Sequence, residues 1–148
     1  MKKSVSLILV LVLIISCFML NTKTVQAKTY YYNITLTKKD IFRDGMTIKK
    51  IIFTKHRIKV KGSIRRTDKY SSGNKKRIKN KSFKTTKKTE YSVHAGTYAK
   101  NGKAYQNIVK MSRKKFKKKV RKLLDDNTGL GLVIKVKNKK VIFARLTS

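Results

Sequence analysis

The chain has 148 residues, of which 40 are Lys or Arg and only 6 are Asp or Glu, so its formal net charge is +34 at pH 7. This length suits one domain, and the single cysteine excludes an internal disulfide framework. So few carboxylates argue against acid–base catalysis, and the excess of positive charge favours a partner that is anionic.

The N-terminus has the three parts of an export signal. Lys2 and Lys3 precede an apolar run over residues 5–20, and residues 25–27 place small or β-branched side chains where signal peptidase recognises them. A positive start, an apolar stretch and a cleavage motif in this order are typical of a secretory signal. We therefore expect cleavage after Ala27.

Two other interpretations of this segment stay open. Residues 14–17 resemble a bacterial lipobox, which would make Cys17 a lipidated N-terminus, although residues 18–20 continue the apolar run beyond it. The other interpretation is an uncleaved membrane anchor. All three predict an exported protein that is secreted or held at the cell surface.

The mature protein is then a single domain of residues 28–148, after a signal peptide of residues 1–27. Removing Lys2, Lys3 and Lys23 lowers the net charge from +34 to +31. The domain has no cysteine, so its stability must come from an apolar core, which a chain of this size can supply.

The domain opens with a strand. Residues 30–36 place Tyr30, Tyr32, Ile34 and Leu36 on one face and polar side chains on the other. This alternation is typical of a strand with one buried face.

Two further strands are expected at residues 46–54 and 57–65, after a turn at residues 44–45. Only residues 55–56 separate them, which predicts a hairpin. From residue 67 to residue 81 the apolar pattern disappears, and we expect a polar, basic loop.

Two more strand segments are predicted before the spacing of apolar residues changes to that of a helix. Alternation returns over residues 82–86 and 89–93, and residues 101–102 (Asn-Gly) mark a further bend. Residues 111–126 then have the period of an amphipathic helix, with Ser112 as its N-cap. The apolar stripe of this helix consists of Phe116, Val120, Leu123 and Leu124.

The chain ends with a predicted hairpin, in which residues 130–136 and 141–146 are the strands and residues 137–140 the turn. A strand meander, one helix and a C-terminal hairpin are the layout of a small OB-like barrel. The expected fold class is therefore mainly β with one α-helix.

Three segments also resemble a family. Residues 58–64 (IKVKGSI), 83–91 (FKTTKKTEY) and 129–141 (GLGLVIKVKNKKV) resemble small secreted OB-like β-barrel proteins of Gram-positive bacteria, which are largely uncharacterised. The resemblance covers residues 48–148. It implies a fold and an extracellular address, and it carries over no binding or catalytic residue.

No motif for catalysis, a metal or a cofactor emerges. The acids are scattered over predicted turns, a loop and a helix end, and His56 and His94 have no ligand spacing with a cysteine or carboxylate. Gly129-Leu130-Gly131 lacks the lysine and serine of a phosphate loop. We therefore expect no catalytic residues, no metal, no cofactor and no small-molecule substrate.

Basic clusters are the remaining candidates for a site. They lie in the predicted strand and loop after residue 64 and on the polar face of the predicted helix, where they would attract any polyanion. The expected polyanion-binding residues are Arg65, Arg66, Lys75, Lys76, Arg77, Lys114, Lys115, Lys118, Arg121 and Lys122.

We therefore expect a non-enzymatic, exported protein that adheres to an anionic cell-wall polymer or an anionic lipid surface. One alternative is binding of single-stranded nucleic acid in an OB-type groove, with bases stacked on Tyr70, Tyr91, Tyr98 and Tyr105. The competing interpretation of these tyrosines is that they cap the barrel core. A third possibility is an envelope structural or interaction module with incidental charge.

Overall fold

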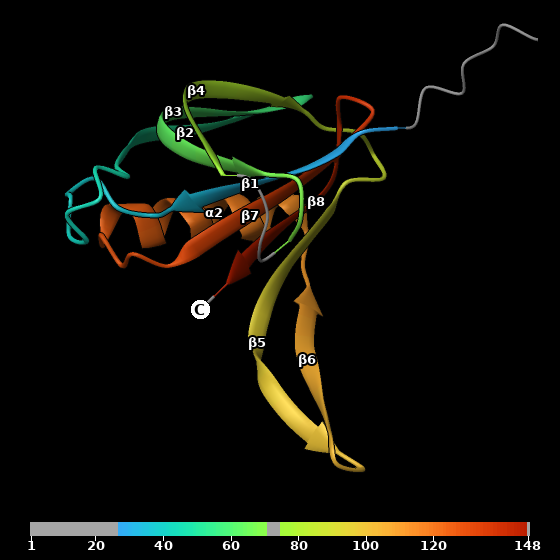
Figure 1. Ribbon diagram of the computed structural model, residues 1–148. Helices are drawn as coiled ribbons and strands as arrows, with labels where there is room; N and C mark the ends of the chain where they lie inside the picture. The colour runs from blue at the N-terminus through green and yellow to red at the C-terminus, as the bar shows by residue number, and fades with distance from the viewer. Residues whose placement is uncertain (1–26, 71–74, 148) are drawn as a thin grey trace, which may run out of the picture.

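A computed structural model describes residues 27–70 and 75–147. The predicted signal segment lies outside these residues except for Ala27, and Cys17 lies outside them too. The elements are β1 (Thr29–Thr35), β2 (Ile48–Thr54), β3 (Arg57–Thr67), β4 (Lys76–Lys84), β5 (Glu90–Lys100), β6 (Lys103–Lys110), α2 (Arg113–Asp125), β7 (Gly131–Lys137) and β8 (Lys140–Thr147) (Figure 1).

The strands form a barrel-like sheet that closes on itself. β1 pairs with β3 on one side and with β7 on the other, and β7 pairs with β8. The first residue of β8, Lys140, pairs with the last residue of β4, Lys84, and β4 pairs with β3. β2 extends β3, and β5 extends β8. The fold is therefore mainly β with one helix, in the predicted order of strands, helix and C-terminal hairpin.

Strand β3 bends so that it pairs with two different strands along one edge. Residues 57–62 pair with β2, whereas residues 65–67 pair with β1. Gly62 lies at the change of partner, with φ +134 and its N–H donated to the Asn80 Oδ1 at 2.9 Å. A Cβ at this position would lie 2.3 Å from the Thr47 carbonyl oxygen, so only glycine fits.

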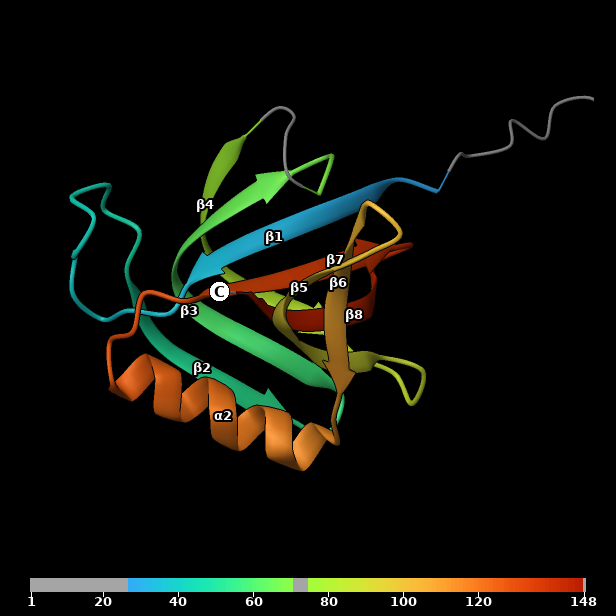
Figure 2. The same ribbon diagram turned by 90° about the horizontal axis from the view of Figure 1, so that it is seen from below.

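The helix closes one side of the barrel core (Figure 2). Phe116, Val120 and Leu124 are buried, and the Phe116 ring centroid lies 5.2 Å from that of Tyr91. The Ser112 side chain accepts a hydrogen bond from the Lys115 N–H, which confirms the predicted N-cap.

The expected inner face of β1 is confirmed, and so are the two strands of the predicted last hairpin. Tyr32, Ile34 and Leu36 are buried, as are Leu132 and Ile134 on β7. Every residue of the core cluster lies between residues 32 and 146. A chain of residues 28–148 therefore retains the whole core.

The predicted polar loop over residues 67–81 is wrong at both ends, because Thr67 belongs to β3 and residues 76–81 belong to β4. Residues 71–74 of this prediction lie outside the described residues. Residues 103–110 form β6, where no strand was predicted. In β4 only Phe83 is buried, and in β6 no residue is buried, so neither strand shows an alternating apolar pattern. His94 lies inside β5, which continues beyond the predicted end of that strand.

The far part of β5 and the whole of β6 form an arm that projects from the barrel (Figure 1). Only residues 90–93 of β5 pair with β8, and the β5–β6 pairing shifts register between His94 and Thr97. No helix among the described residues is both long enough and apolar enough to cross a membrane.

Replacing Gly62 with Ala tests whether the bend of β3 limits the stability of the barrel. We expect a loss of at least about 2 kcal/mol in the free energy of unfolding, from the strained φ and the contact with Thr47. Gly102 also has a positive φ, +69, but no atom lies within 4 Å of the place that a Cβ would occupy there, so Gly102→Ala should lose only about 1 kcal/mol. Equal losses in urea unfolding would contradict this role of Gly62.

Candidate anion-binding site

Four of the predicted basic residues are brought together by strand pairing. In the β3–β4 register Arg65 lies opposite Arg77 and Arg66 opposite Lys76, and Lys75 immediately precedes β4. We call these five residues the hairpin cluster. Residues far apart in the sequence thus form one positive surface.

The other predicted residues lie together on α2, and we call them the helix face. All five are exposed, and none forms an ion pair with a carboxylate in the part of the chain that the structure describes. They are Lys114, Lys115, Lys118, Arg121 and Lys122. Figure 2 shows α2 on one side of the barrel and the end of the β3–β4 hairpin on the other, so the two sets form separate surfaces.

Two arginines of the hairpin cluster hold the chain segment that precedes β2. Arg77 donates hydrogen bonds to the Gly45 carbonyl, to the Asp44 carbonyl at 3.4 Å and to the Ser63 Oγ at 3.1 Å. Arg65 lies 3.6 Å from the Asp44 carboxylate. Their guanidinium groups therefore have structural partners, unlike the exposed Lys75 and Lys76.

Acids neutralise little of the basic surface. Three of the 40 Lys and Arg residues, Lys2, Lys3 and Lys23, lie outside the described residues, which leaves 37 cations with all 6 acids. The ion pairs within the described residues join Asp44, Glu90 and Asp125 to neighbouring cations. The excess of cations is therefore uncompensated.

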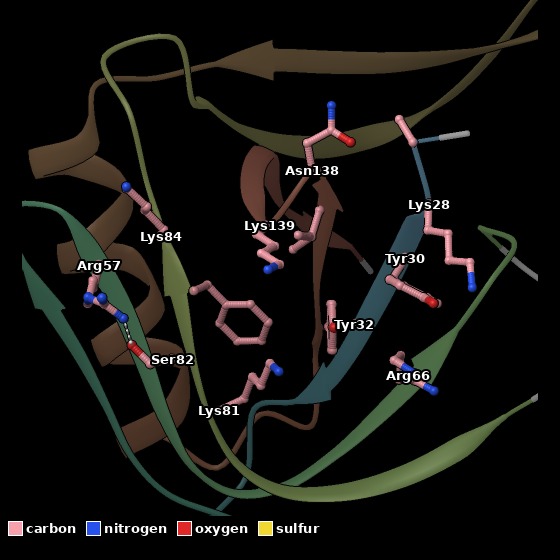
Figure 3. A pocket seen from close by; sticks show the side chains of 13 residues that line it. Lys28, Tyr30, Tyr32, Arg57, Arg66, Lys81, Ser82, Lys84, Asn138 and Lys139 are labelled. Carbon is pink, nitrogen blue, oxygen red and sulfur yellow. Dashed lines mark hydrogen bonds between the residues drawn. The ribbon is translucent and has the colours of Figure 1, made fainter. Parts of the chain in front are cut away.

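A pocket of about 670 Å³ opens between β1, β3, β4 and the β7–β8 turn (Figure 3). Its described lining contains six cations and no carboxylate. The cations come from five separate stretches of chain, and they are Lys28, Arg57, Arg66, Lys81, Lys84 and Lys139. We call this the cationic pocket.

The floor of the cationic pocket is aromatic. Tyr32 and Phe83 are 5% and 2% exposed, and their ring centroids lie 4.8 Å apart in an edge-to-face arrangement. Tyr30 and Val136 extend this apolar surface. The pocket therefore combines a low-polarity base with a positively charged rim.

Contacts inside the protein hold several rim cations in place. The Arg66 guanidinium lies 4.7 Å from the Tyr30 ring centroid, and the Lys81 Nζ lies 5.9 Å from that of Tyr32. The Arg57 Nη1 donates to the Ser82 Oγ at 3.3 Å. These contacts lower the conformational freedom that an incoming anion would otherwise have to remove.

Burial raises the pKa of the Tyr32 hydroxyl above its usual value, while the Arg66 guanidinium acts in the opposite direction. Since the ordinary value is about 10, the hydroxyl is neutral at physiological pH. Tyr32 therefore adds no negative charge to the floor of the pocket.

Sequence reasoning identified only Arg66 among the pocket cations. Lys28 precedes β1, Lys81 lies on β4 and Lys139 lies in the β7–β8 turn, so their local sequence does not indicate that they share one pocket. The sequence carried a signal for Tyr30 and Tyr32, which share the predicted inner face of β1. It carried none for the closure of β4 against β8 that completes the pocket.

The tyrosines proposed for base stacking do not share one site. Tyr91 is buried against Phe116, as expected for a residue that caps the core. Tyr70 packs edge-on against Tyr31, with centroids 5.5 Å apart. The other two are on the arm: Tyr98 is 52% and Tyr105 43% exposed, and they stack on each other at 5.7 Å.

The histidines are also far apart in the fold. His56 is exposed in the β2–β3 turn, whereas the Nε2 atom of His94 is buried in β5 without a hydrogen-bond partner among the described residues. Within residues 27–70 and 75–147, no group of three or more His, Cys, Asp or Glu side chains could hold a metal ion.

Comparison with known proteins identifies no relative. No family model, no curated protein and no solved structure matches this chain. The residues and their geometry are therefore the basis for any functional conclusion.

Arg77→Gln should destabilise the fold, because it removes the hydrogen bonds that hold the segment around Asp44 and Gly45. These bonds are partly exposed to solvent, so we expect a loss of about 1 kcal/mol in the free energy of unfolding. Lys76→Gln is the matched control with the same change in charge, and its effect should stay within about 0.5 kcal/mol. Equal urea unfolding midpoints for the two variants would show that Arg77 has no such structural role.

Proposed function

We propose that this protein is a non-enzymatic, exported binding protein that adheres to an anionic polymer at the bacterial cell surface through its Lys and Arg side chains. The cationic pocket carries this proposal, because its described lining has six cations and no carboxylate. A concave site with charge of one sign concentrates the opposite charge more strongly than an open surface does.

The two predicted surfaces add attraction around this site. The helix face and the exposed lysines of the hairpin cluster have no carboxylate partner among the described residues, so they remain available to a long polyanion. A polymer that spans more than one surface would gain affinity from each. This favours a polymeric ligand over a single small anion.

Export of the protein to the cell surface is part of the proposal. Export would follow from the N-terminal signal, and cleavage after Ala27 would make Lys28 the first residue of the mature chain. Lys28 lines the cationic pocket. The new α-amino group would then add a further positive charge at the rim.

Single-stranded nucleic acid is the second candidate, favoured by one observation. Tyr98 and Tyr105 are exposed side by side on the arm, near Lys100 and Lys103 at its tip. Aromatic rings with adjacent cations are typical of surfaces that stack bases and contact phosphates.

A salt titration of residues 28–148 separates the two candidates. We expect the affinities for teichoic-acid-like poly(glycerol phosphate), single-stranded DNA and duplex DNA to fall with parallel, steep slopes, by on the order of a hundredfold or more between about 50 and 200 mM salt. Fluorescence anisotropy of labelled ligands measures this. A preference for single strands that survives high salt would instead support stacking on the tyrosines.

Neutralising the helix face tests its contribution. The triple change Lys114→Gln, Lys118→Gln and Lys122→Gln should weaken polymer binding at low salt and lower the salt slope by roughly one for each phosphate that is no longer neutralised. Because all three side chains are exposed, the unfolding midpoint should stay the same or rise. Unchanged affinity in this variant would remove the helix face from the binding surface.

A further inference from the structure

We infer that the cationic pocket binds a phosphodiester-linked polyol chain, with adjacent phosphate groups on its rim cations and the uncharged linker against its aromatic floor. This inference rests on the proposed function and names the ligand of that same site. Three observations carry it: the number of cations, the apolar floor and the covered ring faces.

The positive charge of the rim favours a ligand that carries more than one anionic group. Six cations line the pocket without a neighbouring carboxylate, so they repel one another until anions bind. Arg57 and Arg66 are anchored by Ser82 and Tyr30, which fixes two of the positive groups at separate points of the rim. A ligand with anions at regular intervals would satisfy both at once.

The volume of the pocket and its apolar floor favour a ligand with an uncharged linker between those anions. A volume of about 670 Å³ is much larger than a lone phosphate needs and lies within the range of ordinary ligand sites. Tyr30, Tyr32, Phe83 and Val136 provide a surface on which the carbon atoms of a short polyol can pack. A polymer in which phosphate groups alternate with short polyol units has this arrangement of charged and uncharged parts.

The ring faces argue against a nucleic acid base as that linker. Base stacking needs an open aromatic face. Tyr32 and Phe83 pack edge-to-face and are almost fully buried, and Arg66 lies over the Tyr30 ring. Tyr32 and Phe83 therefore offer ring edges and apolar surface, and Arg66 covers one face of the Tyr30 ring.

The test compares two variants of residues 28–148 that carry the same change in net charge. The pocket variant combines Lys28→Gln, Lys81→Gln and Lys84→Gln, all at exposed positions on the rim. The control variant combines Lys49→Gln, Lys50→Gln and Lys55→Gln, which are exposed and lie outside the pocket, the hairpin cluster, the helix face and the arm. Titration calorimetry with poly(glycerol phosphate) at about 0.15 M salt measures both, because weak surface contacts are largely screened there.

We expect the pocket variant to lose at least about tenfold in affinity for poly(glycerol phosphate), and the control variant less than about threefold. Equal losses would overturn the pocket site but leave charge-based adhesion intact. An unmodified protein that binds neither poly(glycerol phosphate) nor DNA at any salt concentration would instead overturn the proposed function itself.

Two further binding measurements distinguish this ligand from other molecules that carry phosphate groups. A loss for single-stranded DNA larger than the loss for poly(glycerol phosphate) would make the pocket a nucleic acid site and overturn the inference. Binding to phosphatidylglycerol vesicles without binding to the soluble polymer would assign the phosphate to a lipid headgroup, which also contradicts it.

A measurement on the unmodified protein removes any dependence on the folding of the variants. The methyl signals of Val136 and the ring signals of Phe83 should shift when poly(glycerol phosphate) is added, because both residues line the floor of the pocket. Signals that stay in place while the helix face shifts would contradict the inference.

Discussion

The bend of β3 at Gly62 is the constraint on which the barrel and its pocket depend. Because β3 changes partner there, it pairs with β2 and β1 along one edge and with β4 along the other. Arg57 and Arg66 are nine positions apart, which a straight strand would extend to about 30 Å. Both nevertheless line the same pocket, because the strand curves around it. The shape of the backbone, rather than local sequence density, brings these charges together.

Along the strands, side chains alternate between the apolar core and the charged surface. Ile58 and Val60 point into the barrel, whereas Lys59 and Lys61 between and beside them are exposed. The same separation on α2 places Phe116 inward and the lysines of the helix face outward. Self-repulsion among these cations lowers the stability of the compact state, and anions that screen or bind the surface would restore it.

Sequence reasoning succeeded where one face of an element is buried. The inner faces of β1 and α2 and the strands of the last hairpin could be predicted, because their apolar residues recur with a regular period. β6 and the first two thirds of β4 were missed, because Phe83 is the only buried residue of the two strands, and lysine-rich strands exposed on both faces resemble loops. The pocket could not be predicted either, because it needs the contact between Lys84 and Lys140 that closes the ring.

The two kinds of basic site differ in how salt affects them. Exposed lysines on the helix face would interact with a polyanion over distances that salt screens, since the Debye length is about 8 Å at physiological ionic strength. An anion held over the partly apolar floor of the pocket would be screened less, and the contacts of Arg66 with Tyr30 and of Arg57 with Ser82 limit the ordering that its binding would require. Diffuse charge would therefore govern how fast a polymer is captured, and the pocket would govern which polymer is retained.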